Sequence, residues 1–264
     1  MVTRLETPVA YELPVGEHRI TLNAHIGAPV ALHHTGAIHC IHCGRATRKS
    51  FSQGYCYPCF TSLAQCDSCI VKPEQCHYHE GTCREPAWGE QHCMQPHMVY
   101  LANSSGIKVG ITRASQVPTR WMDQGASQAL AVLEARDRYT SGLIEVIFKQ
   151  HVADRTDWRR MLKGTPEPAN LAEERDTLYD ACASELDDLL QQRGADAYRR
   201  LPNGVPTTID YPVQSYPQKV SSLNFDKTAH CTGTLMGIKG QYLILDTGVL
   251  NIRKFAGYEV DVTL

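Results

Sequence analysis

The cysteines of this chain are concentrated in one short segment, and their placement constrains the fold more than any other feature. Nine of the eleven cysteines lie between Cys40 and Cys93. Thiolates separated by two residues can both bind one tetrahedral Zn²⁺ ion, because a tight turn aims the two sulfurs at the same point. We therefore expect this segment to be stabilised by metal in place of a large hydrophobic core.

The first two cysteine pairs have the spacing of a zinc ribbon. A loop of about a dozen residues separates the pairs, as zinc modules with paired ligands require. Gly44 and Gly54 lie in this loop, where the backbone around a metal-bound sulfur needs conformational freedom. The predicted ligands of a first structural zinc ion are Cys40, Cys43, Cys56 and Cys59.

A second structural zinc ion is expected immediately after the first, although its ligand set stays open. The predicted ligands are Cys66, Cys69, Cys83 and Cys93. Three further residues compete for the same places, namely Cys76, His79 and His97. An iron–sulfur cluster is the alternative to zinc, because four thiolates can also hold one. Cys182 and Cys231 lie far from the segment and are expected to be ordinary buried thiols.

Composition and charge restrict the location and the partners. The formal net charge of −2 excludes a histone-like or ribosomal-protein composition, so any contact with nucleic acid must be local. Basic residues are in excess over residues 99–163 and acidic residues over 164–200. The chain lacks a membrane-spanning apolar run and a signal-peptide pattern. We expect a cytoplasmic protein without a membrane partner, where clustered cysteines bind metal more readily than they form disulfides.

The order of local patterns predicts an α+β protein with three modules. Residues 1–97 combine β-strands with the double zinc-binding segment, and residues 98–200 combine short strands with amphipathic helices. Residues 201–218 contain four prolines and predict an extended linker. Residues 219–264 alternate β-branched and aromatic residues with glycines, which predicts a small β-barrel-like module. The helices and strand expected in the central part are Val117–Gln124, Ala129–Arg138, Ser141–Leu162 and 171–193.

Residues 98–162 resemble the GIY-YIG nuclease superfamily. The resemblance is carried by the sequences VYLANSSGIKVGIT, PTRW and SGLIEVIFKQH. It implies a small three-stranded sheet flanked by helices. It also implies that a tyrosine, a second tyrosine or lysine, an arginine and a metal-binding glutamate meet in one catalytic site.

Transferred to this chain, the resemblance implies a catalytic set of four residues. They are Tyr100, Lys108, Arg120 and Glu145, with Gly110 in the place of the glycine of the second motif. Lys108 stands where a second tyrosine is usual in that superfamily. The residues implied to contact nucleic acid are Lys108, Arg113 and Arg120, and Arg113 is also a rival for the role of Arg120.

The chemistry of these residues suits phosphodiester cleavage. A tyrosine with a lowered pKa can activate water, an arginine can bind the phosphate, and Glu145 can hold Mg²⁺ or Mn²⁺. Each residue also has an ordinary structural explanation. Tyr100 can be a core residue, Glu145 can pair with Lys149 one helical turn away, and Arg120 can stack on its neighbouring tryptophan.

The whole chain also resembles a bacterial zinc-ribbon family of unknown function, through phrases such as QGYCYPCF, CREPAWGEQHC and GIKGQYLILD. Together, the patterns predict a zinc-stabilised nucleic-acid-processing protein, with a divalent-metal-dependent nuclease as the enzymatic version. The first alternative is a non-catalytic adaptor that uses a degenerate GIY-YIG scaffold to bind nucleic acid or a protein partner. A redox or metal-handling protein that uses the excess thiols is the third.

Overall fold

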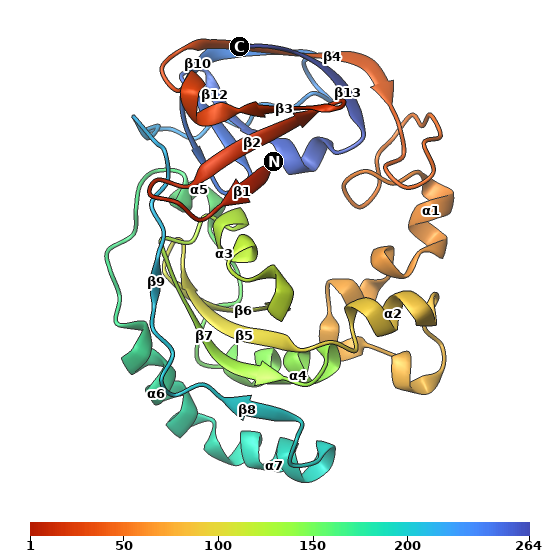
Figure 1. The fold of residues 1–264 in the computed structure, drawn as a ribbon, viewed down its shortest axis with the longest axis vertical. Helices are drawn as coiled ribbons and strands as arrows, with labels where there is room; N and C mark the ends of the chain where they lie inside the picture. The colour runs from red at the N-terminus through yellow and green to blue at the C-terminus, as the bar shows by residue number, and fades with distance from the viewer.

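The computed structural model describes all residues from Met1 to Leu264 and shows an α+β architecture, as the sequence predicts. Three antiparallel sheets form its framework (Figure 1). The small N-terminal sheet contains β1 (Val2–Arg4), β2 (Ala10–Val15) and β3 (His18–Thr21). None of the helices combines the length and the apolar character that crossing a bilayer requires.

The central sheet has the strand order β6-β5-β7-β8, and β9 also pairs with β7. It therefore extends the expected three-stranded sheet by two short strands. In the pairing of β5 with β6, Tyr100 lies opposite Gly110. The strands are β5 (His97–Asn103), β6 (Ile107–Arg113), β7 (Gln128–Ala135), β8 (Tyr198–Arg200) and β9 (Thr207–Thr208).

Five helices follow the first two strands of the central sheet. The helix expected over Ser141–Leu162 ends at Phe148, because the next residues run beside β6, where Val109 N–H donates to the Ala153 carbonyl at 2.8 Å. The helix expected over 171–193 is divided at Cys182. The helices are α3 (Thr119–Asp123), α4 (Arg138–Phe148), α5 (Trp158–Met161), α6 (Leu171–Ala181) and α7 (Ala183–Arg193).

The third sheet joins the two ends of the chain. Its strand order is β12-β11-β10-β4-β13, so β4 from the N-terminal part lies between two C-terminal strands. The two outer strands, β12 and β13, do not pair with each other, so the C-terminal module is an open sheet and the expected barrel-like closure is absent. The strands are β4 (Pro29–Ile38), β10 (His230–Lys239), β11 (Tyr242–Leu245), β12 (Gly248–Asn251) and β13 (Tyr258–Thr263).

The central sheet separates two hydrophobic cores, because successive side chains of a strand point to opposite faces. Val99 and Leu101 face one core, which α4, α6 and α7 complete. Tyr100 and Ala102 face the other core, which contains residues of α3 and of both terminal sheets. The face that carries Tyr100 is thus covered by the rest of the protein.

The cysteine-rich segment connects the third sheet to the central sheet along one side of the molecule (orange in Figure 1). It contains two short α-helices, α1 (Tyr57–Ser62) and α2 (Pro86–His92). Between them lie four single-turn 3-10 helices, η2 to η5, of which η4 (Pro73–Gln75) packs against α4. Metal-stabilised segments need few regular elements, since the metal replaces a core.

Lys239 of β10 is a fully buried cation. Its ammonium group donates a hydrogen bond to the Gly164 carbonyl at 2.8 Å. It also lies 5.5 Å from the ring centroid of Tyr211 and 5.3 Å from that of Tyr216. Burial lowers the pKa of Lys239 to about 8. Because the unfolded chain binds this proton more tightly, the buried charge destabilises the fold at neutral pH.

We expect Lys239→Met to be more stable than the parent protein at pH 7, and the advantage to shrink as pH rises from about 8 to 10.5. The folded pKa lies below the unfolded pKa, so the parent gains stability in this window, by an amount on the order of 3 kcal/mol. Urea unfolding at several pH values measures the difference between the two proteins. Lys227→Met, at an exposed position, is the matched control, and its stability should stay within about 0.5 kcal/mol of the parent. A flat difference for Lys239→Met would contradict the expectation.

Candidate metal centres and the polar cluster of the central sheet

The first four cysteines converge on one point. All four Sγ atoms lie within 4.8 Å of one another, and those of Cys43 and Cys56 are 3.8 Å apart. Zn–S bonds of about 2.3 Å in a tetrahedron separate the sulfurs by about 3.8 Å, so this arrangement fits a zinc ion. The site formed by Cys40, Cys43, Cys56 and Cys59 is called the first cysteine cluster below.

The backbone around the first cysteine cluster is arranged to support thiolates. Burial alone would raise the pKa of the Cys40 thiol, but hydrogen bonds from the backbone of Cys43, Cys56 and His42 outweigh it and lower this pKa to about 6. Gly44 N–H also closes a tight turn onto the Cys40 carbonyl at 2.9 Å. Thiolates are the form that binds zinc, so this backbone favours the ligand state of Cys40, whereas burial and the neighbouring thiols raise the pKa of Cys59 to about 12.

Two contacts connect the first cysteine cluster to the third sheet. His39 N–H, just before the first ligand, donates to the Gly257 carbonyl at 2.7 Å. Arg253, in the 3-10 helix after β12, donates from Nε to the Gln53 side chain at 3.1 Å. Gln53 belongs to the loop between the two cysteine pairs and adopts a positive φ of 63°.

The remaining cysteines of the segment divide differently from the expected pairs. Cys69, Cys83 and Cys93 line one small cavity together with Cys76, which sequence spacing left only as a competitor. Cys66 does not line this cavity. Burial raises the pKa of the Cys66 thiol, the charge of Arg84 opposes this rise, and the charge of Cys40 adds to it.

The two competing histidines lie outside this cavity. His97 is fully buried in β5, its Nδ1 lies 2.7 Å from the Gln95 carbonyl, and its Nε2 has no hydrogen-bond partner. Burial lowers the pKa of His97 to about 4, so the ring is neutral at pH 7. The His79 ring forms T-shaped arrangements with the rings of Tyr78 and Tyr139.

Four polar residues predicted for the central site lie near one another. The amide of Gln124, at the end of α3, donates to the Tyr100 hydroxyl and accepts from the Lys108 ammonium group. The charges of Arg120 and Glu145 act on both Tyr100 and Lys108. We call Tyr100, Lys108, Arg120, Gln124 and Glu145 the central polar cluster.

Gly110 makes room for the tyrosine of the central polar cluster. A Cβ atom at Gly110 would lie 2.7 Å from the Tyr100 hydroxyl oxygen, closer than two such atoms can approach. A glycine on β6 is therefore required opposite Tyr100. Arg113, the rival of Arg120, lies at the other end of β6 opposite His97 and does not join the cluster.

The tyrosine of the cluster is closed off from solvent. Tyr100 is 1% exposed and Lys108 is 7% exposed, whereas Arg120 and Glu145 are half-buried. The expected lowering of the tyrosine pKa is wrong, because burial raises the pKa of Tyr100 despite the opposing effects of Arg120 and Gln124. Burial, together with the charge of Arg120, lowers the pKa of Lys108 to about 8.

Two carboxylates near the cluster, Glu145 and Asp154, interact electrostatically. The pKa of Glu145 is raised, first by burial and then by the negative charge of Asp154. The charge of Lys149, one helical turn away, opposes this rise. Asp154 also acts on Lys108, because residues 152–154 run beside β6. Sequence patterns gave no signal for Asp154 or Gln124, since neither belongs to a motif.

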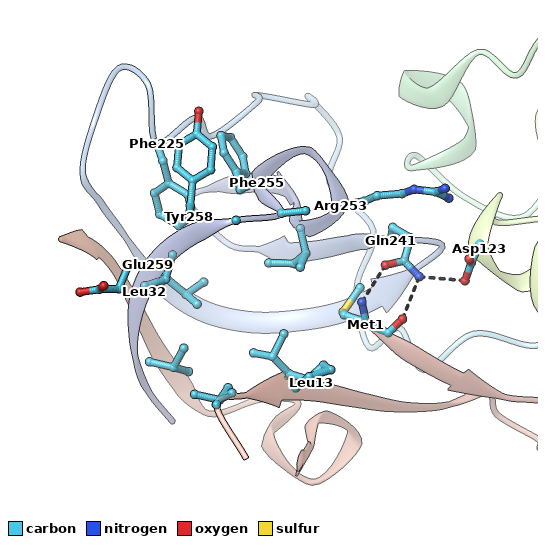
Figure 2. Close-up of a pocket in the computed structure, with 18 residues that line it drawn as sticks. Met1, Leu13, Leu32, Asp123, Phe225, Gln241, Arg253, Phe255, Tyr258 and Glu259 are labelled. Atoms are coloured by element: carbon cyan, nitrogen blue, oxygen red, sulfur yellow. Dashed lines mark hydrogen bonds between the residues drawn. The ribbon is translucent and has the colours of Figure 1, made fainter. Parts of the chain in front are cut away.

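A pocket of about 660 Å³ lies elsewhere, between the N-terminal sheet and the third sheet. Figure 2 shows aromatic rings at one end and the chain terminus at the other. At that second end, Gln241 accepts a hydrogen bond from the Met1 amino group at 2.9 Å and donates one to Asp123 at 2.8 Å. None of the predicted catalytic residues lines this pocket.

The fold and its sites define a class of protein: an α+β chain whose sheets are joined by a cysteine-rich segment with a four-cysteine cluster able to bind zinc. The chain belongs to the family described as "Protein of unknown function (DUF2797)", whose model matches residues 27–260. No curated protein and no solved structure matches it significantly.

Proposed function

We propose that this protein processes nucleic acid and that the central polar cluster is its phosphodiester-cleaving site, supported by Mg²⁺ or Mn²⁺. One observation carries the proposal. Gln124 hydrogen-bonds both Tyr100 and Lys108, while the charges of Arg120 and Glu145 act on the same two residues. These are the four residues for which the resemblance to the GIY-YIG nucleases implies a catalytic role.

The charges of the cluster support phosphate binding at one side and cation binding at the other. Burial is the main cause of the lowered pKa of Lys108, and the charge of Arg120 lowers it further; an anionic phosphate would relieve this repulsion. Glu145 and Asp154 also repel each other, and a divalent cation would relieve theirs. Cleavage of a phosphodiester requires both kinds of charge, since the phosphate must be bound and the leaving oxygen stabilised.

Tyr100 requires a movement before it can act in this proposal. Gln124 lies over its hydroxyl group, and burial keeps the phenol protonated at neutral pH. A phosphate bound by Lys108 and Arg120 would compete for the hydrogen bonds that Gln124 makes. Displacement of Gln124 would then expose the tyrosine to the substrate, and the phenol would become available to orient or deprotonate the attacking water.

The first cysteine cluster supplies the recognition part of the proposal. Hydrogen bonds of His39 and Arg253 attach it to the third sheet and to the 3-10 helix after β12. Burial lowers the pKa of Arg253, and the charge of Arg120 contributes to the same shift, so the two arginines are neighbours. A nucleic-acid backbone bound along this module would reach the central polar cluster.

Glu145→Gln tests the enzymatic proposal. We expect the parent protein to cleave at least one of branched, single-stranded and double-stranded DNA or RNA in Mg²⁺ or Mn²⁺. The variant should be slower by roughly 100-fold, because an amide binds a divalent cation far more weakly than a carboxylate. Glu185→Gln, on the exposed face of α7, is the matched control and should retain full activity. No cleavage by the parent, or equal cleavage by Glu145→Gln, would refute the enzymatic version.

The second candidate function is a non-catalytic adaptor, and the burial of Tyr100 and Lys108 favours it. In this version the cluster is a structural network and the surface binds nucleic acid or a protein. Salt dependence separates the two partner classes. Affinity for nucleic acid falls steeply with salt because bound phosphates release counterions, whereas an apolar protein interface responds little.

A further inference from the structure

The small cavity of the cysteine-rich segment is surrounded by four thiols that no zinc pattern in the sequence groups together. Cys69, Cys76, Cys83 and Cys93 all line it, and Tyr78 and Trp88 also contribute to its wall. Cys69 and Cys93 are buried, and the other two are half-buried. The neighbouring thiols contribute to the raised pKa of Cys69 and Cys93, after the larger effect of burial, so their sulfurs share one environment.

The sulfurs of this second set are more widely spaced than those of the first cysteine cluster. In the first cluster all four Sγ atoms lie within 4.8 Å of one another, whereas no three of the second set meet this limit. A single zinc ion needs sulfurs about 3.8 Å apart, given Zn–S bonds of about 2.3 Å. An iron–sulfur cluster is several atoms across and holds its cysteines around its outside, so it requires the wider spacing.

A half-buried cation, Arg138, lies beside the four thiols. Burial lowers the pKa of Arg138, while the charges of Cys93, Cys69 and Cys76 oppose this lowering. Its Nε–H group is buried without a hydrogen-bond partner, and its backbone N–H donates to the Cys93 carbonyl at 2.8 Å. A thiolate-bound cluster carries net negative charge, and its sulfurs accept hydrogen bonds. Arg138 supplies both the opposite charge and an unused donor.

A rival ligand set at the same place is already satisfied by the protein. Asp67, Cys69 and His77 also offer ligand atoms within 4.8 Å of one another. However, the Asp67 carboxylate pairs with Arg84 at 2.7 Å and accepts from Cys69 N–H at 3.3 Å. The His77 Nδ1 atom lies 2.7 Å from the Thr82 hydroxyl. These groups therefore orient the loop of Cys69 and need no metal.

We propose that Cys69, Cys76, Cys83 and Cys93 bind an iron–sulfur cluster, distinct from the zinc ion of the first cysteine cluster. The cluster would fix the loop that carries η4 between Cys69 and Cys76. This loop packs on α4, and a Cβ atom at Gly142 of α4 would lie 2.6 Å from the backbone nitrogen of Glu74. The inference does not depend on the proposed nuclease activity, because it concerns metal content alone.

The test is the metal content of the full chain purified without oxygen. We expect about one zinc per chain, together with iron and acid-labile sulfide in equal amounts of about two or four, and visible absorption from thiolate-to-iron charge transfer. Two zinc ions per chain with no iron, or no metal beyond one zinc, would overturn the proposal.

Serine variants assign the ligands. Cys76→Ser and Cys83→Ser should lose most of the iron and the visible absorption while retaining zinc. Cys66→Ser is the matched control and should retain both metals. Cys66 forms a Cys-x-x-Cys pair with Cys69 but does not line the cavity. Cys40→Ser should lose zinc and retain iron. Loss of iron from Cys66→Ser with retention in both Cys76→Ser and Cys83→Ser would contradict the assignment. Should a variant fail to fold, the metal content of the parent still decides the proposal.

Discussion

Gly142→Ala should lower the free energy of unfolding by about 2 kcal/mol, although alanine is the better helix former. The added methyl group would lie 2.6 Å from the Glu74 nitrogen and 2.7 Å from the Pro73 carbonyl carbon. Both are backbone atoms, so neither can turn aside as a flexible side chain would. The helix and the loop between Cys69 and Cys76 must therefore separate, which also displaces Glu145 on the same helix.

Denaturant unfolding and metal analysis measure the two effects of this change. The variant should be less stable and should retain less metal at the four thiols that surround the cavity. Gly164→Ala is the matched control, because a Cβ atom at Gly164 meets nothing within 4 Å. Its stability should stay within about 0.5 kcal/mol of the parent. Unchanged stability and metal content in Gly142→Ala would show that the loop does not depend on the close contact with α4.

Removal of zinc from the first cysteine cluster should unfold residues 39–59 and reduce the melting temperature by about 10 °C or more. This segment has few buried apolar side chains, so its order depends on the four thiolates and their metal. The effect should spread to the third sheet through the His39–Gly257 hydrogen bond. Cys43→Ser, at an exposed ligand position, removes one thiolate without disturbing the core.

Hydrogen exchange and zinc content provide the measurement for this second effect. Amides of residues 39–59 should exchange much faster in Cys43→Ser, and bound zinc should fall below one ion per chain. Cys66→Ser keeps all four ligands of the first cysteine cluster and should retain both protection and zinc. Full zinc content and unchanged exchange in Cys43→Ser would mean that the segment folds without a complete tetrahedral site.

The first cysteine cluster could be predicted from the sequence because its spacing is local. Two residues between ligands define a turn, and two such turns define a site. The second set could not be predicted in this way. Asp67 lies between Cys66 and Cys69, accepts a hydrogen bond from Cys69 N–H and caps a short 3-10 helix. Only Cys69 of this pair lines the cavity, and the spacing of the pair along the chain gives no sign of that difference.

The central polar cluster was only partly predictable. The order of Tyr100, Lys108, Arg120 and Glu145 along the chain predicted their proximity, because hairpin strands and the following helices are neighbours in space. Sequence patterns could not show that α3 and both terminal sheets cover the face of Tyr100. That burial depends on contacts with segments far away in the sequence, and it reverses the expected shift of the tyrosine pKa.

The fold class followed from alternating strand and helix patterns, but the pairing of β4 did not. β4 was expected to belong with the N-terminal module, and in the structure His33 of β4 lies opposite His230 of β10 and Asp261 of β13. A strand reveals its two faces through the sequence pattern, whereas its partners depend on the whole chain. The third sheet therefore needs both β4 from the N-terminal part and the four strands from the C-terminal part of the chain.

The position of β4 between two C-terminal strands has a consequence for biosynthesis. During translation, β4 leaves the ribosome about two hundred residues before β10 and β13 exist, so its two edges stay open for most of synthesis. The cysteine-rich segment needs only nearby residues and can acquire metal during that interval. We expect a nascent chain that binds its metals early and completes its third sheet only after release, which leaves β4 dependent on protection against aggregation until then.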